Sequence, residues 1–127
     1  MATFQRLSTL SVIAGAVVRL YRFVQLQADG KYDEVGVAQA RADGVAAQAA
    51  LADGDVFAME PLPSGAIMKL EAGAAVTRGA QIASDNQGRA IAHVTTAGNY
   101  ILGLALDAAA GAGEIIRVQL AQHQDGA

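Results

Sequence analysis

The chain has 127 residues, enough for one domain, and it contains no cysteine. Disulfide frameworks, thiolate metal sites and cysteine nucleophiles are therefore excluded. Charged residues make up 17 % of the chain, and the formal net charge is −3 with nine basic residues scattered singly. Nucleic-acid-binding proteins normally carry a basic stripe or patch, so the composition argues against nucleic acid as a partner.

The apolar part of the composition is rich in small residues. Hydrophobic residues account for 53 % of the chain, yet aromatic residues are only 5 %, tryptophan is absent and there are 14 glycines. A small, apolar chain with few charges often has a partner protein covering part of its surface. No run of about 18 apolar residues lacks charges, so we expect neither a transmembrane helix nor a membrane partner.

Turn and strand signals alternate through the first half of the chain. Residues 1–15 show no clean helical or strand period and predict an extended N-terminal arm. The β-branched and aromatic run at 16–26 predicts a strand, Asp29-Gly30 a hairpin turn, and 32–37 the returning strand. The alanine-rich segment 45–50 predicts a short helix, because alanine has the highest helix propensity.

The second half continues with short strands. Pro61 and Pro63 exclude a central strand at their positions, and the segment 85–88 reads as a hairpin loop. Residues after Gln122 are polar and predict a flexible tail. The expected strands from Asp55 onward cover residues 55–59, 66–70, 81–84, 89–94, 100–106 and 114–120.

Short strands at spacings near ten residues, with turn chemistry between them, predict a mainly β fold. We expect a small single-domain β-barrel or β-sandwich with one or two short helical turns. The N-terminal arm would cover residues 1–15, the β domain 16–121 and the tail 122–127.

A weak internal repeat is also visible. Gly36-Val37-Ala38, an alanine-rich link and then Gly54-Asp55-Val56-Phe57 resemble Gly103-Leu104-Ala105, a second such link and then Gly113-Glu114-Ile115-Ile116. The pattern suggests two similar halves that pair around a pseudo-twofold axis. Alanine-rich sequences also look alike without any structural relation, and this alternative stays open.

The residues needed for an active site are missing. His93 lies in the expected strand 89–94 and His123 in the polar tail, and neither has a serine–aspartate or Glu-x-x-His setting. Asp53 and Asp55 are not followed by the pattern of a calcium loop. We therefore predict no catalytic residues, no cofactor and no metal site, and we expect that the protein is not an enzyme.

The late strands instead indicate an oligomer. They are apolar on both faces, and a strand of that kind is either buried on both faces or covered by a partner subunit. We predict a subunit interface that includes Tyr100, Leu102 and Ile115.

The same region carries a resemblance to a known family. The sequence resembles the small capsid cement, or head decoration, proteins of tailed bacteriophages over about residues 16–120. The first half matches through Gly36-Val37-Ala38 and Gly54-Asp55-Val56. The second half matches through Glu71–Gly79, Asp85–Ala90, Ile101–Ala109 and Gly113–Leu120.

The resemblance implies a structural virion protein on the outer surface of a phage capsid, made in the cytoplasm of the bacterial host. Such a protein stabilises the assembled shell by bridging major capsid subunits, and it does so as a homo-oligomer, with a trimer favoured over a dimer.

The N-terminal arm is the expected capsid contact. Its residues Phe4, Arg6, Leu7 and Leu10 would order on docking or add a strand to a capsid sheet edge. The alternative function is a small β-rich glycan- or host-binding module, although such modules usually expose tryptophan and tyrosine.

Overall fold

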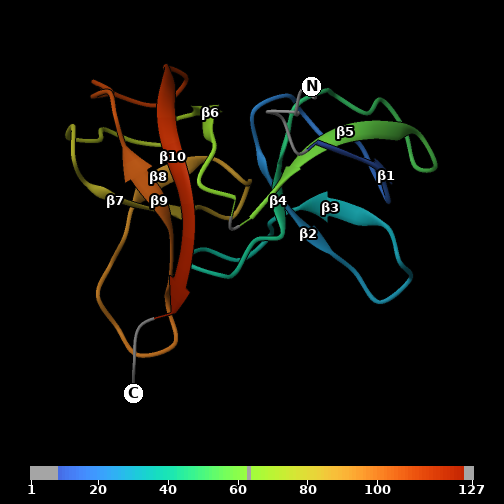
Figure 1. Ribbon diagram of the computed structural model, residues 1–127, viewed down its shortest axis with the longest axis horizontal. Helices are drawn as coiled ribbons and strands as arrows, with labels where there is room; N and C mark the ends of the chain where they lie inside the picture. Colours follow the sequence, from blue (N-terminus) through green and yellow to red (C-terminus); the bar gives the residue numbers. More distant parts are fainter. Residues whose placement is uncertain (1–8, 63, 125–127) are drawn as a thin grey trace, which may run out of the picture.

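The computed structural model describes residues 9–62 and 64–124, which form two antiparallel five-stranded sheets (Figure 1). The first sheet contains β1 (Leu10–Ile13), β2 (Phe23–Leu26), β3 (Tyr32–Glu34), β4 (Gly44–Ala46) and β5 (Val56–Pro61). The second contains β6 (Ile67–Glu71), β7 (Gln81–Ser84), β8 (Ala90–Ala92), β9 (Tyr100–Ala105) and β10 (Ile115–Gln124).

The two sheets have the same topology. Their strand orders are β1-β5-β4-β2-β3 and β6-β10-β9-β7-β8, so each strand of the first sheet has a counterpart five strands later. Bridges outside the strands are duplicated as well: Ala14 with Tyr32 matches Ala72 with Ala90, and Val18 with Ala50 matches Val76 with Ala109. The chain is therefore a tandem repeat, with residues 10–61 as the first repeat and 68–120 as the second.

Counterpart residues follow from these pairs. They lie 58 positions apart early in each repeat, as Ala14 and Ala72 do, and 59 apart later, as Ala50 and Ala109 do. On this basis Gly44-Val45-Ala46 is the counterpart of Gly103-Leu104-Ala105, not Gly36-Val37-Ala38 as the sequence pattern suggested. The match of Gly54–Phe57 to Gly113–Ile116 is confirmed by the pairing of β5 and β10 with corresponding neighbours.

The hairpin turns explain why the strands reverse where they do. The turn between β2 and β3 ends on Gly30, with φ +83°, and its counterpart Gly88 has φ +76°. These are left-handed conformations that glycine adopts without the penalty of a side chain. Asp85 reinforces the second turn because its Oδ1 accepts hydrogen bonds from the N–H groups of Gln87 and Arg89, both at 2.8 Å.

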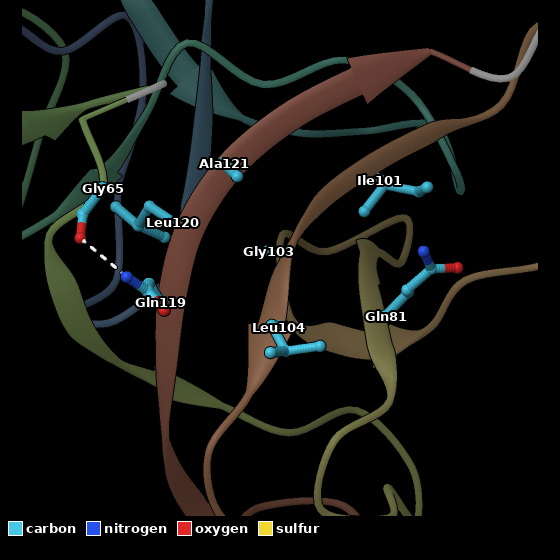
Figure 2. Close-up of a pocket in the computed structure, with 8 residues that line it drawn as sticks. All are labelled: Gly65, Gln81, Ile101, Gly103, Leu104, Gln119, Leu120 and Ala121. Atoms are coloured by element: carbon cyan, nitrogen blue, oxygen red, sulfur yellow. Dashed lines mark hydrogen bonds between the residues drawn. The ribbon is translucent and has the colours of Figure 1, made fainter.

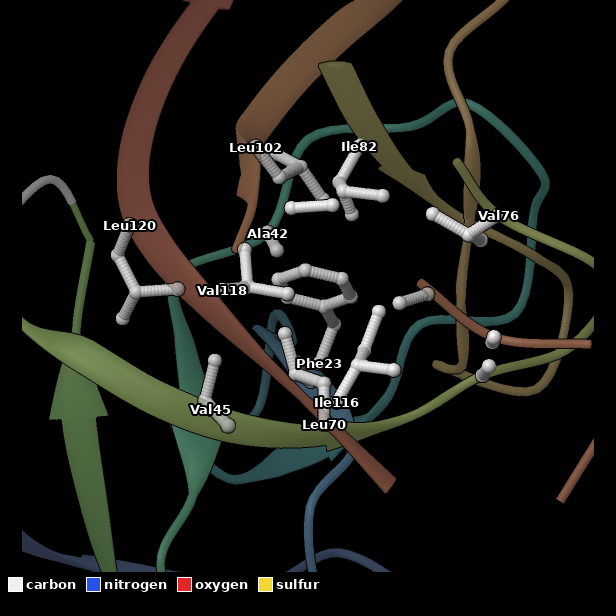
Figure 3. Packing of buried hydrophobic residues seen from close by; sticks show 14 of the residues in the cluster. Phe23, Ala42, Val45, Leu70, Val76, Ile82, Leu102, Ile116, Val118 and Leu120 are labelled. Atoms are coloured by element: carbon white, nitrogen blue, oxygen red, sulfur yellow. The ribbon is translucent and has the colours of Figure 1, made fainter. Parts of the chain in front are cut away.

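Each repeat buries the same set of positions. In the first repeat this core contains Ala14, Val18, Val24, Ala46, Ala50, Phe57 and Met59. The counterparts of all seven lie in the larger core of the second repeat. That larger core also receives Phe23 and Val45 from the first repeat, and the ring of Phe23 lies among Ile82, Leu102 and Val118 (Figure 3). The two repeats are therefore joined by shared hydrophobic burial.

Several expectations need correction. The mainly β fold is confirmed, but neither sheet closes into a barrel and the described residues contain no helix. Segment 45–50, expected as a helix, instead begins in β4, where Val45 and Ala46 are fully buried. Tertiary burial outweighs the helix propensity of alanine there.

The chain ends of the domain also differ from expectation. Residues 10–13, expected in an extended arm, form β1, which pairs with β5 along its whole length. Ala14 is fully buried, so the folded sheet begins well before residue 16. At the other end, β10 continues to Gln124, because His123 and Gln124 pair with Ile101 and Tyr100 after a bulge.

Candidate interaction surface

The described residues form a shallow pocket of 310 Å³ on the second sheet (Figure 2). Its floor comes from β9, through Ile101, Gly103 and Leu104, and its walls from β7 and β10, through Gln81 and Gln119. Gly65, in the linker between the repeats, borders it, and the Gln119 side chain donates to the Gly65 carbonyl at 3.5 Å. Leu120 and Ala121 complete the lining.

The lining determines what the pocket can bind. None of its residues carries an ionisable side chain or a hydroxyl nucleophile. Leu104 is 42 % exposed, a large apolar side chain open to solvent beside two amides. Such a surface can bury an apolar side chain and form a few hydrogen bonds to the backbone beside that side chain. The pocket is therefore suited to binding a protein surface and contains no group for covalent chemistry.

Asp53 and Asp55, the two carboxylates considered above as cation ligands, instead form an ion pair and hydrogen bonds within the protein. Asp53 pairs with Lys31, with Oδ1 and Nζ 2.9 Å apart, and this carboxylate raises the pKa of Lys31. Asp55 accepts hydrogen bonds from the N–H groups of Leu51 and Ala52, each at 3.1 Å. Over residues 9–62 and 64–124, no three histidine or carboxylate side chains gather in a way that could hold a metal ion. In the same ranges no helix is long enough to cross a membrane.

Arg117 and Asp107 form a bidentate ion pair on the outer side of the second repeat. The guanidinium donates from Nε to Asp107 Oδ2 at 2.9 Å and from Nη2 to Oδ1 at 2.8 Å. The Arg117 side chain and backbone N–H hold the pKa of the Asp107 carboxyl well below its usual range. The counterpart of Asp107 is Gln48, whose Oε1 accepts from the Ala58 N–H at 3.0 Å in the same position. The same backbone N–H position therefore donates to a carboxylate in the second repeat and to a side-chain amide in the first.

The expected contact residues lie in different environments. Leu10 begins β1 and is 50 % exposed, whereas Phe4, Arg6 and Leu7 lie outside the described residues. Ile115, at the start of β10, is 48 % exposed, and its counterpart Val56 is also exposed. These exposed positions are compatible with the predicted contacts, which stay predictions.

Tyr100 and Leu102 differ from each other although they share β9. Tyr100 is half-buried against the core, and its N–H donates to the Gln39 carbonyl of the first repeat at 3.0 Å. Leu102 is fully buried and packs near Phe23 (Figure 3). Because it presents no surface to a second subunit, Leu102 contributes to the junction of the two repeats, and the interface prediction is kept for Tyr100 and Ile115.

Sequence reasoning missed the pocket. Gln81, Leu104 and Gln119 lie on three strands and none forms a local motif. The internal repeat could have revealed the pocket. A correct alignment of the two repeats makes Leu104 the counterpart of Val45 and Gln81 the counterpart of Phe23, and both counterparts are buried in the first repeat.

Comparisons with known proteins agree with this picture. The sequence model of a family described as phage cement protein matches residues 4–120. The chain is similar in structure to the N base of the head fiber protein gp8.5 of bacteriophage phi29, with a TM-score of 0.71 and 18 % sequence identity. That alignment covers 89 % of this chain and 92 % of the other, and at this identity it shows a common fold. No curated protein sequence matches the chain.

Proposed function

This chain belongs to the phage cement protein family, and from that membership we propose that it decorates the outer surface of a phage capsid as a homo-oligomer. In this role it stabilises the assembled shell by bridging major capsid subunits. A trimer is favoured over a dimer. The single observation that carries the proposal is the family match over nearly the whole chain.

The tandem repeat supports a bridging role. The same five-stranded module occurs twice in one chain, and both copies expose an apolar β-branched residue at the same place, Val56 and Ile115. Two similar surfaces on one molecule can engage two similar subunits of a lattice. The second contact then forms at high effective concentration, which strengthens binding without any single strong contact.

Binding to an assembled shell also explains how such a protein would stabilise it. A ligand that binds the assembled lattice and not its free subunits shifts the equilibrium toward the lattice by mass action. Chemistry is not required for this effect, and the pocket offers none.

The N-terminal segment is proposed as part of the capsid contact through Phe4, Arg6, Leu7 and Leu10. Since β1 begins at Leu10, deletion of residues 2–8 spares all ten strands of the described residues, whereas deletion of residues 2–14 removes β1. We expect the shorter deletion to fold and to bind heads more weakly. Binding by the 2–8 deletion equal to that of the full chain would remove the segment from the contact.

The proposal as a whole is tested by co-sedimentation. The purified chain is mixed with mature heads that lack it and, separately, with immature heads, and the bound fraction is measured. Binding that saturates at a fixed number of copies per mature head supports decoration. Failure to sediment with either kind of head, together with binding to glycans alone, would instead support a glycan- or host-binding module.

A further inference from the structure

We propose that the pocket on the second repeat receives the β2–β3 hairpin of a second copy of this chain, so that protomers join head to tail. The contact would copy the one that already joins the two repeats within a protomer. This inference rests on the homo-oligomer of the proposed function and specifies the surfaces through which it forms.

The β7–β8 hairpin of the second repeat makes part of the internal contact, to which Glu71, Tyr100 and Gln122 also contribute. Its Gly88 carbonyl accepts the Phe23 N–H at 2.7 Å, and its Gln87 carbonyl accepts from Arg22 Nη1 at 2.9 Å. The Ser84 carbonyl accepts the N–H of Gln39 at 2.8 Å. The surface of the first repeat that the second repeat covers includes Phe23 and Val45, which belong to the shared core, and the buried Glu60, which pairs with Val45.

The pocket is the counterpart of that receiving surface. Gln81 lies where Phe23 lies, Leu104 where Val45 lies, and Gln119 where Glu60 lies. Phe23, Val45 and Glu60 are fully buried, whereas Gln81, Leu104 and Gln119 are exposed. The second repeat thus has the receiving surface, and nothing within the described protomer covers it.

The first repeat has the inserting hairpin. Its β2–β3 turn extends away from the second sheet (Figure 1), and Gly30 has no heavy atom within 4 Å of the position its Cβ would occupy. At its counterpart Gly88, a Cβ would lie 2.6 Å from the Phe23 carbonyl oxygen. Leu26, the counterpart of Ser84, is 43 % exposed, and Ile13, the counterpart of Glu71, is 46 % exposed. The free hairpin is therefore flanked by apolar side chains that the protomer does not bury.

The geometry of the internal contact favours a second copy as the occupant. The contact is heterologous: a hairpin of one repeat meets a sheet face of the other, and within the described residues the reverse contact is not formed. A heterologous contact leaves one unmatched surface at each end, and copies that join through such surfaces form closed rings or open filaments. The predicted backbone hydrogen bond runs from the Gln81 N–H of one copy to the Gly30 carbonyl of the next.

The first test alters each surface separately. Leu104→Glu places a charge in the pocket and Leu26→Glu places one beside the hairpin, and the matched control is Leu51→Glu. Leu51 is 80 % exposed on the loop before β5, and it belongs neither to the pocket lining nor to the β2–β3 turn. Sedimentation velocity over a concentration series should show at least about a tenfold rise in the dissociation constant for the first two variants and no change for the control. Wild-type association by both Glu variants would overturn the proposal.

A further variant sharpens this test. Gly30→Ala should weaken association, because its methyl group would meet the Gln81 carbonyl of the neighbouring copy, as a Cβ at Gly88 would meet the Phe23 carbonyl. Unchanged association in Gly30→Ala counts against this contact.

The second test distinguishes head-to-tail from two-fold association. Because the chain lacks cysteine, Asp29→Cys and Gln81→Cys each introduce a single thiol. With a short bifunctional thiol cross-linker, the head-to-tail contact predicts a covalent dimer in the mixture of the two variants and none in either alone. A dimer in one variant alone would show that like surfaces meet, which overturns the proposal.

These outcomes are separable from failure of the proposed function. Saturable head binding by the wild type, with association unaffected by Leu104→Glu, would reject the head-to-tail contact and leave decoration standing. A chain that stays monomeric at every concentration and when bound to heads would reject the contact and the homo-oligomer together. Head-to-tail association without head binding would reject decoration alone.

Discussion

Glu60 has an unusual environment for a carboxylate. It is fully buried on β5, and neither side-chain oxygen has a hydrogen-bond partner among the described residues. Burial of an unpartnered charge opposes folding more strongly than burial of a neutral amide. Glutamine has the shape of glutamate without its charge, and the repeat already carries glutamine at the counterpart position, the exposed Gln119.

We therefore expect Glu60→Gln to raise the free energy of unfolding at pH 7 by about 1–2 kcal/mol. Urea denaturation followed by circular dichroism measures the change. The exposed Glu114→Gln removes the same charge without this burial and serves as the control. Destabilisation by Glu60→Gln would mean that the carboxylate itself stabilises the junction.

A second residue-scale prediction concerns Asp107, whose pKa is held low by Arg117. A carboxyl whose pKa is lower in the folded state stabilises the fold at pH values above its unfolded pKa, about 4. That stability is lost as the pH falls below this value toward the lowered pKa. Asp107→Asn should therefore cost more stability at pH 7 than at pH 3, in urea denaturation at both pH values. An equal loss at both would assign the effect to packing.

At the scale of elements, a comparison of the same substitution in the two hairpin turns distinguishes the cost of backbone strain from the cost of lost packing. Gly30→Ala and Gly88→Ala both force a side chain into a left-handed conformation, which costs about 1 kcal/mol. At Gly88 alone the added methyl group also meets the Phe23 carbonyl oxygen within the protomer.

In the monomer we expect Gly30→Ala to lose about 1 kcal/mol and Gly88→Ala at least about 3 kcal/mol, the difference measuring the contact between the repeats. Chemical denaturation at low protein concentration gives both values. Equal losses would show that the β7–β8 hairpin can move away from β2 at little cost.

The elements also show what the sequence could predict. Strands 81–84 and 100–105 follow from local signals, because the hairpin turn and the β-branched or apolar run lie within one short window. The helix at 45–50 was wrong because Ala46 and Ala50 are fixed by burial in a sheet that forms from distant segments. The pocket was missed for a related reason: it depends on the register between two repeats whose sequences differ at Phe23 and Gln81.

At the scale of the molecule, the two repeats share one core. Phe23 belongs to β2 yet packs with residues of the second repeat, including Ile82 and Leu102 (Figure 3). Repeats joined by a shared core unfold together if the junction is strong relative to each repeat. We therefore expect a single unfolding transition for the wild-type monomer.

Phe23→Ala should lower the stability of the monomer by about 3–5 kcal/mol and separate the unfolding of the repeats, because it leaves a cavity at their junction. Its counterpart Gln81→Ala is exposed and should change the stability by no more than about 0.5 kcal/mol. Differential scanning calorimetry detects both the shift and the number of transitions. A single, equally cooperative transition in Phe23→Ala would show that the ring does not couple the repeats.

The linker at 62–66 gives the two kinds of joint different lifetimes. Within a protomer this short tether holds hairpin and receiving sheet together, so dilution cannot part them. The joint between protomers has no tether, and its central side chain is an amide, Gln81, in place of an aromatic ring. Dilution would therefore open an assembly at alternate joints only, releasing intact two-module chains that can be exchanged and reused.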